Sequence, residues 1–181
     1  MNTFFSSDYH FFHKNVIKYC NRPFLSVEEM NETMITRHNE LVSDNDTTYM
    51  LGDIAFVKNI NDAIDILNQM NGKKILITGN HDFHNLKNRE FRNCFELISP
   101  LLEIKIDGQM IVLCHYSMEV WNKSHHKSYH LFGHSHGSMP DNPNKLSFDV
   151  GVDTNNFYPY TYQQVKQRMS KKKFVPVDHH E

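Results

Sequence analysis

Short apolar runs alternate with longer helix-spaced runs over the first half of the sequence. Three short runs rich in apolar residues predict strands, at residues 3–7, 47–51 and 73–78. Between them, apolar residues recur at helical spacing over 27–43 and 59–70, and Ser26 with Glu29 forms a capping-box sequence before the first of these helices. Strands that alternate with helices favour βαβ units and a partly parallel sheet.

The second half of the sequence is richer in predicted strands. Residues 97–107 and 109–114 are expected to form a hairpin around Asp107-Gly108. The remaining predicted elements are a loop or short helix over 11–24, a polar helix over 86–95, strands over 129–132 and 146–153, and a final helix over 162–169. Because no repeat or linker interrupts the chain, residues 1–181 are expected to form one domain with a basic and polar tail over 170–181.

Composition narrows the class of protein. The chain has 181 residues, 39% of them hydrophobic, and a net charge of −2, which disfavours a disordered chain or a protein that coats nucleic acid. Three cysteines without CxxC spacing favour reduced thiols and a cytoplasmic protein. Polar residues interrupt the N-terminal segment, so no signal peptide is expected, and no apolar run approaches the roughly 18 residues of a membrane span.

Histidine is the unusual feature of the composition, with thirteen copies, several of them beside Asp, Asn and Gly at the ends of apolar runs. His134 and His136 follow a predicted strand, and on an extended backbone residues i and i+2 point the same way. Asp8 and His10 have the same spacing. Histidines packed in the core or exposed on the surface are the alternative explanation. Seven groups at predicted strand ends are candidate metal ligands: Asp8, His10, Asp53, Asn80, His115, His134 and His136.

Taken in order, the motif blocks are D-x-H at 8–10, G-D at 52–53, G-N-H-D at 79–82, a lone histidine at 115 and G-H-x-H at 133–136. This order resembles the calcineurin-like metallophosphoesterase superfamily. Residues 8–15, 22–24 and 149–153 resemble its small single-domain bacterial and phage phosphoesterases more closely. The G-D block lacks the GDxxDRG continuation of the protein phosphatases, so a dedicated phosphoprotein phosphatase is disfavoured. The resemblance implies an α/β fold, a four-layer α-β-β-α sandwich of two mixed β-sheets flanked by helices.

The resemblance also implies a dinuclear metal centre bridged by Asp53, with Asp8, His10 and His136 on one ion and Asn80, His115 and His134 on the other. Imidazole and oxygen ligands without thiolate suit Mn²⁺, which we expect, with Fe, Zn²⁺, Ni²⁺ or Mg²⁺ as alternatives. Two divalent ions about 3.5–4 Å apart activate a bridging hydroxide that attacks phosphorus. A structural zinc site would leave too many of these ligands unused.

The same resemblance assigns His81 to protonation of the leaving group or stabilisation of its charge, and Asp82 to the orientation of His81. Candidate substrate contacts are His13, Asn15, Arg22 and Tyr116. The expected reaction is hydrolysis of a phosphodiester in a small phosphoester or nucleotide, without a membrane or tightly bound nucleic acid as partner. A phosphomonoesterase or nucleotide pyrophosphatase with the same mechanism is one alternative. A catalytically silent metal-binding scaffold is another.

Overall fold

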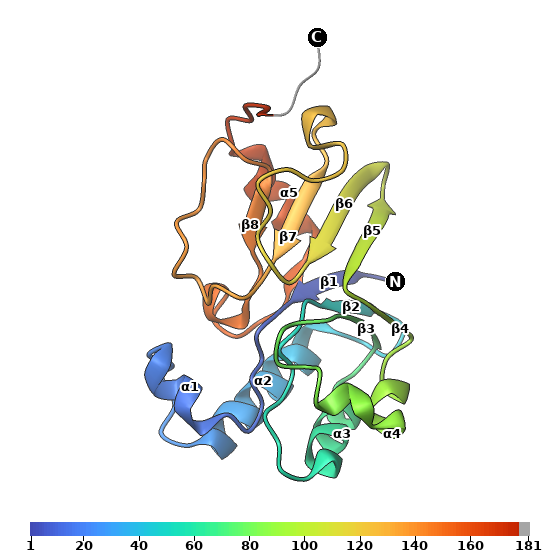
Figure 1. Cartoon of the computed structure of the whole chain (residues 1–181), viewed down its shortest axis with the longest axis vertical. Helices are drawn as coiled ribbons and strands as arrows, with labels where there is room; N and C mark the ends of the chain where they lie inside the picture. The colour runs from blue at the N-terminus through green and yellow to red at the C-terminus, as the bar shows by residue number, and fades with distance from the viewer. Residues whose placement is uncertain (178–181) are drawn as a thin grey trace.

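The three runs predicted as strands in the first half join two later strands in one five-stranded sheet of the computed structural model, which describes residues 1–177 (Figure 1). Its strand order is β4-β3-β2-β1-β9. The first four strands in the sequence run parallel to their neighbours, and β9 is antiparallel to β1. The bounds are β1 Thr3–Ser6, β2 Thr47–Met50, β3 Lys73–Ile77, β4 Leu97–Ser99 and β9 Tyr160–Thr161.

A second sheet has the order β5-β6-β7-β8, with β5 Leu101–Ile106, β6 Gln109–Cys114, β7 Tyr129–Phe132 and β8 Ser147–Asp149. The hairpin around Asp107-Gly108 is confirmed, but its predicted first arm divides at Pro100 between β4 and β5. Proline has no N–H for a strand ladder, so the chain can leave the first sheet there and enter the second. The strands β6, β7 and β8 are mutually parallel, so both sheets are mixed.

Helices occupy most of the segments that their apolar spacing predicted. Their bounds are α1 Lys14–Tyr19, α2 Val27–Leu41, α3 Ile60–Gln69, α4 Arg89–Asn93 and α5 Tyr162–Ser170, with single 3₁₀ turns at Asn85–Lys87, Ser124–His126 and Val152–Thr154. The predicted helix over 86–95 is shorter in the structure because Asn88 ends the preceding 3₁₀ turn. The Asn88 side chain then accepts a hydrogen bond from the Phe91 amide at 3.0 Å and caps the new helix.

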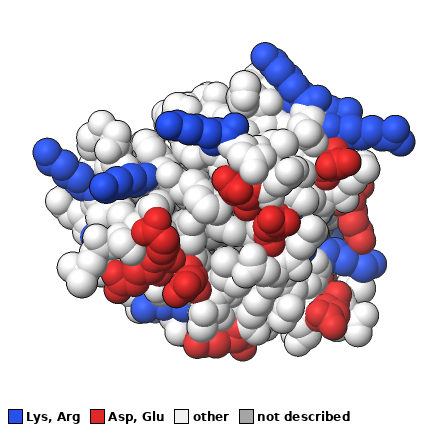
Figure 2. All heavy atoms as spheres, turned by 90° about the horizontal axis from the view of Figure 1, so that it is seen from below, with Lys and Arg blue, Asp and Glu red and all other residues white. Residues whose placement is uncertain are grey.

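Charged side chains of both signs are interspersed over the face seen in Figure 2. Part of the predicted basic tail packs back on the body, since Lys172 donates to the carbonyl of Ser147 at 2.7 Å and that of Asn142 at 3.0 Å. The remainder of that tail, residues 178–181, lies outside the described part of the chain. Within residues 1–177, no helix combines the length and apolar character needed to cross a bilayer.

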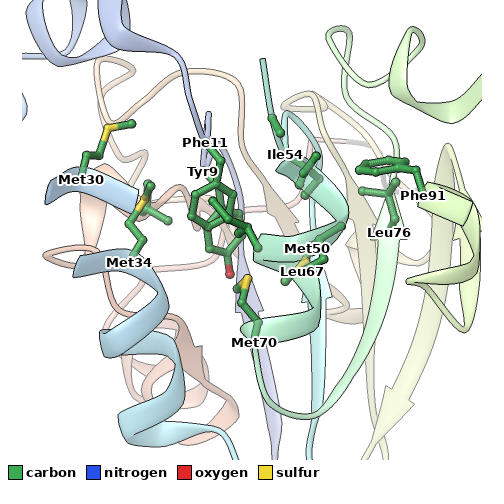
Figure 3. Packing of buried hydrophobic residues seen from close by; sticks show 14 of the residues in the cluster. Tyr9, Phe11, Met30, Met34, Met50, Ile54, Leu67, Met70, Leu76 and Phe91 are labelled. Carbon is green, nitrogen blue, oxygen red and sulfur yellow. The ribbon is translucent and has the colours of Figure 1, made fainter. Parts of the chain in front are cut away.

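The first sheet is covered on both faces, as its near-continuous apolar strands predict. On one face, α2, α3 and α4 pack on it through a cluster that includes Met30, Met34, Met50, Leu67, Leu76 and Phe91 (Figure 3). On the other face, Phe5, Leu51 and Ile77 join Ile111, Leu113 and Leu131 of the second sheet and Val165 of α5 in a second cluster. The protein is therefore an α/β sandwich of two mixed sheets with helices, as expected.

Candidate metal centre

The motif blocks follow the carboxyl ends of β1, β2, β3, β6 and β7, where parallel strands bring their following loops together. The structure gathers six of the predicted ligands into two groups, each with its ligand atoms within 4.8 Å of one another. These groups are Asp8, His10 and His136, and Asp53, His115 and His134. The seventh, Asn80, places Oδ1 3.0 Å from Nε2 of His115. The clustered side chains can bind metal ions.

Five of the seven candidate ligands have a left-handed backbone, which non-glycine residues adopt rarely: Asp8, His10, Asp53, His134 and His136 have φ between 49° and 69°. The extended geometry used to pair His134 with His136 is therefore wrong. The two residues lie in a tight turn after β7 and join different groups. Strained backbone of this kind persists where the surroundings hold it, and it concentrates at functional sites.

Motif glycines allow the turns to approach each other closely. A Cβ atom on Gly79 would lie 2.2 Å from Oδ1 of Asp53, and one on Gly52 would lie 2.5 Å from the Gly79 nitrogen. A Cβ atom on Gly133 would lie 2.5 Å from Oδ2 of Asp8. These distances are shorter than real Cβ contacts, so the carboxylates of Asp53 and Asp8 and the Gly79 backbone occupy the space that a side chain would need.

Lone pairs converge around His115, which is fully buried. Its Nδ1 atom donates to the carbonyl of Leu51 at 2.6 Å, so the neutral ring has its lone pair on Nε2. That atom faces Oδ1 of Asn80 at 3.0 Å and Oδ2 of Asp53 at 3.6 Å, and both oxygens are acceptors. Acceptors facing one another favour a cation between them, and imidazole with oxygen is a common ligand set for a divalent metal.

Two further buried atoms fit a metal ion. Oδ1 of Asp8 and Nε2 of His10 have no hydrogen-bond partner among the described residues. Burial raises the pKa of Asp8 to about 8 and lowers the pKa of His10 to about 2. Nε2 of His10 also lies 3.6 Å from Oδ2 of Asp53, the same oxygen that faces His115. Buried polar atoms normally have partners, and a divalent cation in the first group would be a partner for both.

The remaining candidate ligand of the first group, His136, is held by Asp153, a residue to which the sequence analysis gave no role. Its Nδ1 atom donates to Oδ2 of Asp153 at 2.8 Å, while its Nε2 atom lies 3.9 Å from Oδ1 of Asp8. Burial opposes protonation, but the carboxylates of Asp153 and Asp8 raise the pKa of His136 above its ordinary value. The signal available in the sequence was the pair of carboxylates in Asp149-x-Gly-x-Asp153, at the end of the strand predicted over 146–153.

Asp82 does not have the expected role. Its buried carboxylate accepts hydrogen bonds from the backbone amides of Asp53 (3.0 Å), Gly79 (2.8 Å) and Ile54 (2.9 Å). It therefore joins the G-D and G-N turns instead of orienting the imidazole of His81. Backbone amides at these positions have no signal in a sequence motif, which explains the error.

The side chain of His81 is exposed beside the two groups. Its backbone amide donates to Oδ1 of Asp53 at 2.9 Å. The other oxygen of Asp53, Oδ2, therefore remains available to face His10 of the first group and His115 of the second. The imidazole ring packs 4.6 Å from the ring of Phe56 and 5.9 Å from that of His10. Phe56 also stacks on His13 at 4.1 Å, so this aromatic side chain, which the sequence analysis missed, supports one side of the site.

The four predicted substrate contacts lie in different surroundings. Tyr116 is exposed, and its ring lies 4.9 Å from that of His134. His13 is partly exposed, with Nδ1 3.2 Å from Nδ1 of His10. Asn15 is exposed on α1 and lines a surface hollow that also includes Leu25.

Arg22 is incorrectly predicted as a substrate contact. Its side chain has no exposed surface, and its guanidinium group is bonded to Asp153 and to backbone carbonyls. Ser135, which the sequence places between two ligands, donates to Asp149 at 2.6 Å. The same Asp149 oxygen accepts from the Gly137 amide at 2.9 Å, so Asp149 secures the turn that contains His134 and His136.

Beside the first group lies a cavity of about 580 Å³. His136, Asp149 and Asp153 form part of its wall, and Lys145 and Arg168 line other parts of it. The cavity provides room next to the candidate centre for part of a bound molecule.

No protein-family model matches the chain. It is 34% identical over 175 residues to the uncharacterized protein MJ1445 of Methanocaldococcus jannaschii, covering 93% of this chain and 92% of that protein. The solved structure of AQ665, a protein of unknown function from Aquifex aeolicus, superposes with a TM-score of 0.72 at 21% identity and covers 92% of this chain and 98% of its own. A structure characterised as a novel archaeal phosphodiesterase has a TM-score of 0.51 at 16% identity, with 83% and 82% of the two chains covered. The chain belongs to the same family as MJ1445 and has the calcineurin-like metallophosphoesterase fold.

Proposed function

We propose that this protein is a dinuclear-metal phosphoesterase that hydrolyses phosphodiester bonds. The observation that carries the proposal is the set of buried acceptors without donors. Oδ1 of Asp8 and Nε2 of His10 lack hydrogen-bond partners among the described residues. Nε2 of His10 and Nε2 of His115 each lie 3.6 Å from Oδ2 of Asp53. This arrangement fits two cations that share one carboxylate oxygen.

In this proposal, Asp53 would be shared by two ions, of which Asp8, His10 and His136 would hold the first and Asn80, His115 and His134 the second. When bound, two such ions lower the pKa of a water between them and bind the phosphate oxygens of the substrate. Imidazole and oxygen ligands without thiolate favour Mn²⁺, with Fe, Zn²⁺, Ni²⁺ or Mg²⁺ as alternatives.

His81 is proposed to protonate the leaving oxygen. Its ring is exposed to a bound substrate, and its backbone is fixed to Asp53 by the 2.9 Å hydrogen bond. Packing against Phe56 limits the directions in which the imidazole can point. An imidazole so placed can act as a general acid toward the leaving oxygen.

The proposed substrate is a small phosphodiester or nucleotide. The exposed ring of Tyr116 beside His134 offers a surface for a base or aryl group, and the cavity beside His136 offers room for the second group of a diester. The interspersed charges in Figure 2 and the net charge of −2 disfavour a long nucleic acid. A phosphomonoester or a nucleotide pyrophosphate is the alternative substrate.

We further propose that residues 1–181 act as one domain in a reducing, cytoplasmic setting.

The test is an Mn²⁺-supplemented assay with aryl phosphate monoesters and diesters, followed by a panel of nucleotides. We expect turnover of a diester. His81→Ala should lower turnover by roughly 10²–10⁴-fold with metal content retained, as loss of a general acid would. The matched control is His84→Ala, which changes an exposed histidine of the same loop and should leave turnover unchanged.

A second variant tests the shared ligand. Asp53→Ala should remove or scramble both metals because the variant lacks the oxygen that faces both groups. Full activity of Asp53→Ala would refute the bridging role, and loss of metal from His81→Ala would refute the proton-donor role. Bound metal in the wild-type chain without turnover of any substrate would favour a catalytically silent scaffold.

A further inference from the structure

We infer that Arg22 and Asp153 form a positioning pair that fixes the ring of His136 and the backbone of Asp8 for the first metal ion. This inference rests on the proposed metal centre. The pair joins two segments that are 131 residues apart in the sequence, and the metal ligand His136 lies at one end of it.

Asp153 accepts three hydrogen bonds, each of 2.8 Å. Nε of Arg22 donates to Oδ1, while Nη2 of Arg22 and Nδ1 of His136 both donate to Oδ2. A carboxylate cannot donate a proton to Nδ1, so His136 bears its hydrogen there and its lone pair on Nε2. Nε2 is the atom that lies 3.9 Å from Oδ1 of Asp8, so the pair selects the tautomer that can bind the first ion.

Arg22 makes a second set of contacts to the D-x-H turn. Nη2 donates to the Asp8 carbonyl at 2.7 Å, and Nη1 donates to the Tyr9 carbonyl at 2.8 Å. The remaining Nη1 hydrogen is directed to the sulfur of Met30 at 3.4 Å. All five guanidinium N–H groups therefore have acceptors, and two of these acceptors belong to a turn in which Asp8 has a φ of 57°. A lysine has one ammonium group and cannot reproduce this planar set of bonds.

The geometry argues against a separate metal site at this place. Potential ligand atoms of Cys20, His136 and Asp153 lie within 4.8 Å of one another, which satisfies the distance requirement for such a site. Both oxygens of Asp153 are already bonded to Arg22, however, and the guanidinium charge opposes a second cation there. The assignment of Asp153 is therefore to orient His136.

The pair supports only one of the two proposed ions. The second ion depends on His115, whose Nδ1 atom is fixed by the carbonyl of Leu51 and not by a side chain. Loss of a carboxylate that orients a metal-bound histidine commonly weakens metal binding by roughly 10–100-fold. Removing Asp153 should therefore weaken the first ion selectively, whereas a general effect on folding would weaken both ions alike.

The experiment is a titration of the metal-free full-length chain with Mn²⁺. Calorimetry measures the affinity of each ion, and electron paramagnetic resonance reports whether the bound ions are spin-coupled. The wild type should bind two ions with a spin-coupled spectrum. Asp153→Asn should bind one ion with near wild-type affinity and the other roughly 10–100-fold more weakly, with an isolated Mn²⁺ spectrum at one equivalent. Arg22→Lys should show the same selective loss to a smaller extent, which keeps the inference testable if Asp153→Asn does not fold.

The matched control is the ion pair between Arg168 and Asp141, at 3.0 Å, since Asp141→Asn should leave both Mn²⁺ affinities unchanged. Equal weakening of both ions in Asp153→Asn and Arg22→Lys, or wild-type affinities in both variants, would overturn the positioning role. Two bound Mn²⁺ ions with selective loss in the variants, but no phosphoester turnover by the wild type, would overturn the proposed activity and support this inference. A wild-type chain that binds no Mn²⁺ would overturn both.

Discussion

At position 79 of the candidate centre there is no room for a side chain larger than that of glycine. The φ of Gly79 is not in the left-handed region, so an alanine there would be excluded by contact alone: the added Cβ atom would lie 2.2 Å from Oδ1 of Asp53. We predict that Gly79→Ala displaces Asp53, weakens metal binding and lowers the free energy of unfolding by roughly 1–3 kcal/mol, as overpacking does. Metal content after dialysis and urea unfolding would measure the two effects.

Gly108 is the matched control for this prediction. It has a φ of +83° in the β5–β6 turn, and a Cβ atom added there would meet no atom within 4 Å beyond its chain neighbours. Gly108→Ala should cost roughly 1–2 kcal/mol of stability through backbone strain while metal content stays at the wild-type value. Equal metal loss in both variants would contradict the steric role of Gly79.

The clustering of the candidate ligands was predictable from the sequence because each follows an apolar run and belongs to a short ordered block. The bonds that orient these ligands were not predictable in the same way. Arg22 meets Asp153 across 131 residues, and Asp82 bonds to backbone amides that no motif records. The left-handed backbone of His134 and His136 was also hidden, because i and i+2 spacing is equally compatible with a strand.

Helix α2 contains a buried histidine that couples stability to pH. Burial lowers the pKa of His38 to about 4, from an ordinary value near 6.5. Its Nε2 atom donates to the carbonyl of Asn71 at 3.0 Å, and Nδ1 has no hydrogen-bond partner among residues 1–177. The unfolded chain therefore takes up a proton at this position below about pH 6.5, whereas the folded chain does so only below about pH 4.

We predict that the free energy of unfolding falls as the pH is lowered from about 6.5 to 4. Over this window His38 accounts for up to one of the protons that the unfolded chain binds in excess of the folded chain, and this excess sets the slope. His38→Gln, which keeps a donor for the Asn71 carbonyl, should show a shallower fall across this window. Above about pH 7 the two curves should be separated by a constant offset, which is the internal control. Parallel curves down to pH 4 would exclude the contribution of His38. Urea unfolding at each pH provides the measurement.

Elements with clear local signals were predicted well. Apolar spacing identified α2, α3 and α5, and Ser26 caps α2 by accepting from the Glu29 amide at 3.1 Å. The capping box is incomplete, because the Glu29 carboxylate accepts from Leu25 at 2.7 Å instead of the cap residue. The division of the predicted 97–107 arm between two sheets depends on tertiary packing, and only Pro100 marked it in the sequence.

Ligands of each proposed ion come from both sheets. The first ion would join Asp8 and His10, after β1, to His136 beyond β7, and the second would join Asn80, after β3, to His115 beyond β6. A ligand that binds only the folded state stabilises it by about 2.7 kcal/mol at a concentration 100 times its dissociation constant. Metal should therefore stabilise the contact between the two sheets.

We predict that removal of metal by a chelator lowers the Tm by roughly 5–10 °C, and that added Mn²⁺ restores it. Asp53→Ala is the control, since its Tm should respond little to the chelator. A wild-type Tm that is insensitive to both chelator and Mn²⁺ would show that metal does not join the sheets. Differential scanning calorimetry measures the Tm of the wild type and of Asp53→Ala, with the chelator and with added Mn²⁺.

The strand that completes the first sheet comes after every candidate ligand in the sequence. β9 pairs with β1 through Phe4 with Thr161 and Phe5 with Tyr160, and so covers an edge that the beginning of the chain would otherwise leave open. An unpaired edge is a template for association with another chain. A nascent or truncated chain that ends before Tyr160 would contain every candidate ligand and still be prone to self-association on β1. Synthesis through β9 is therefore needed to cover the β1 edge, although β9 supplies none of the candidate ligands.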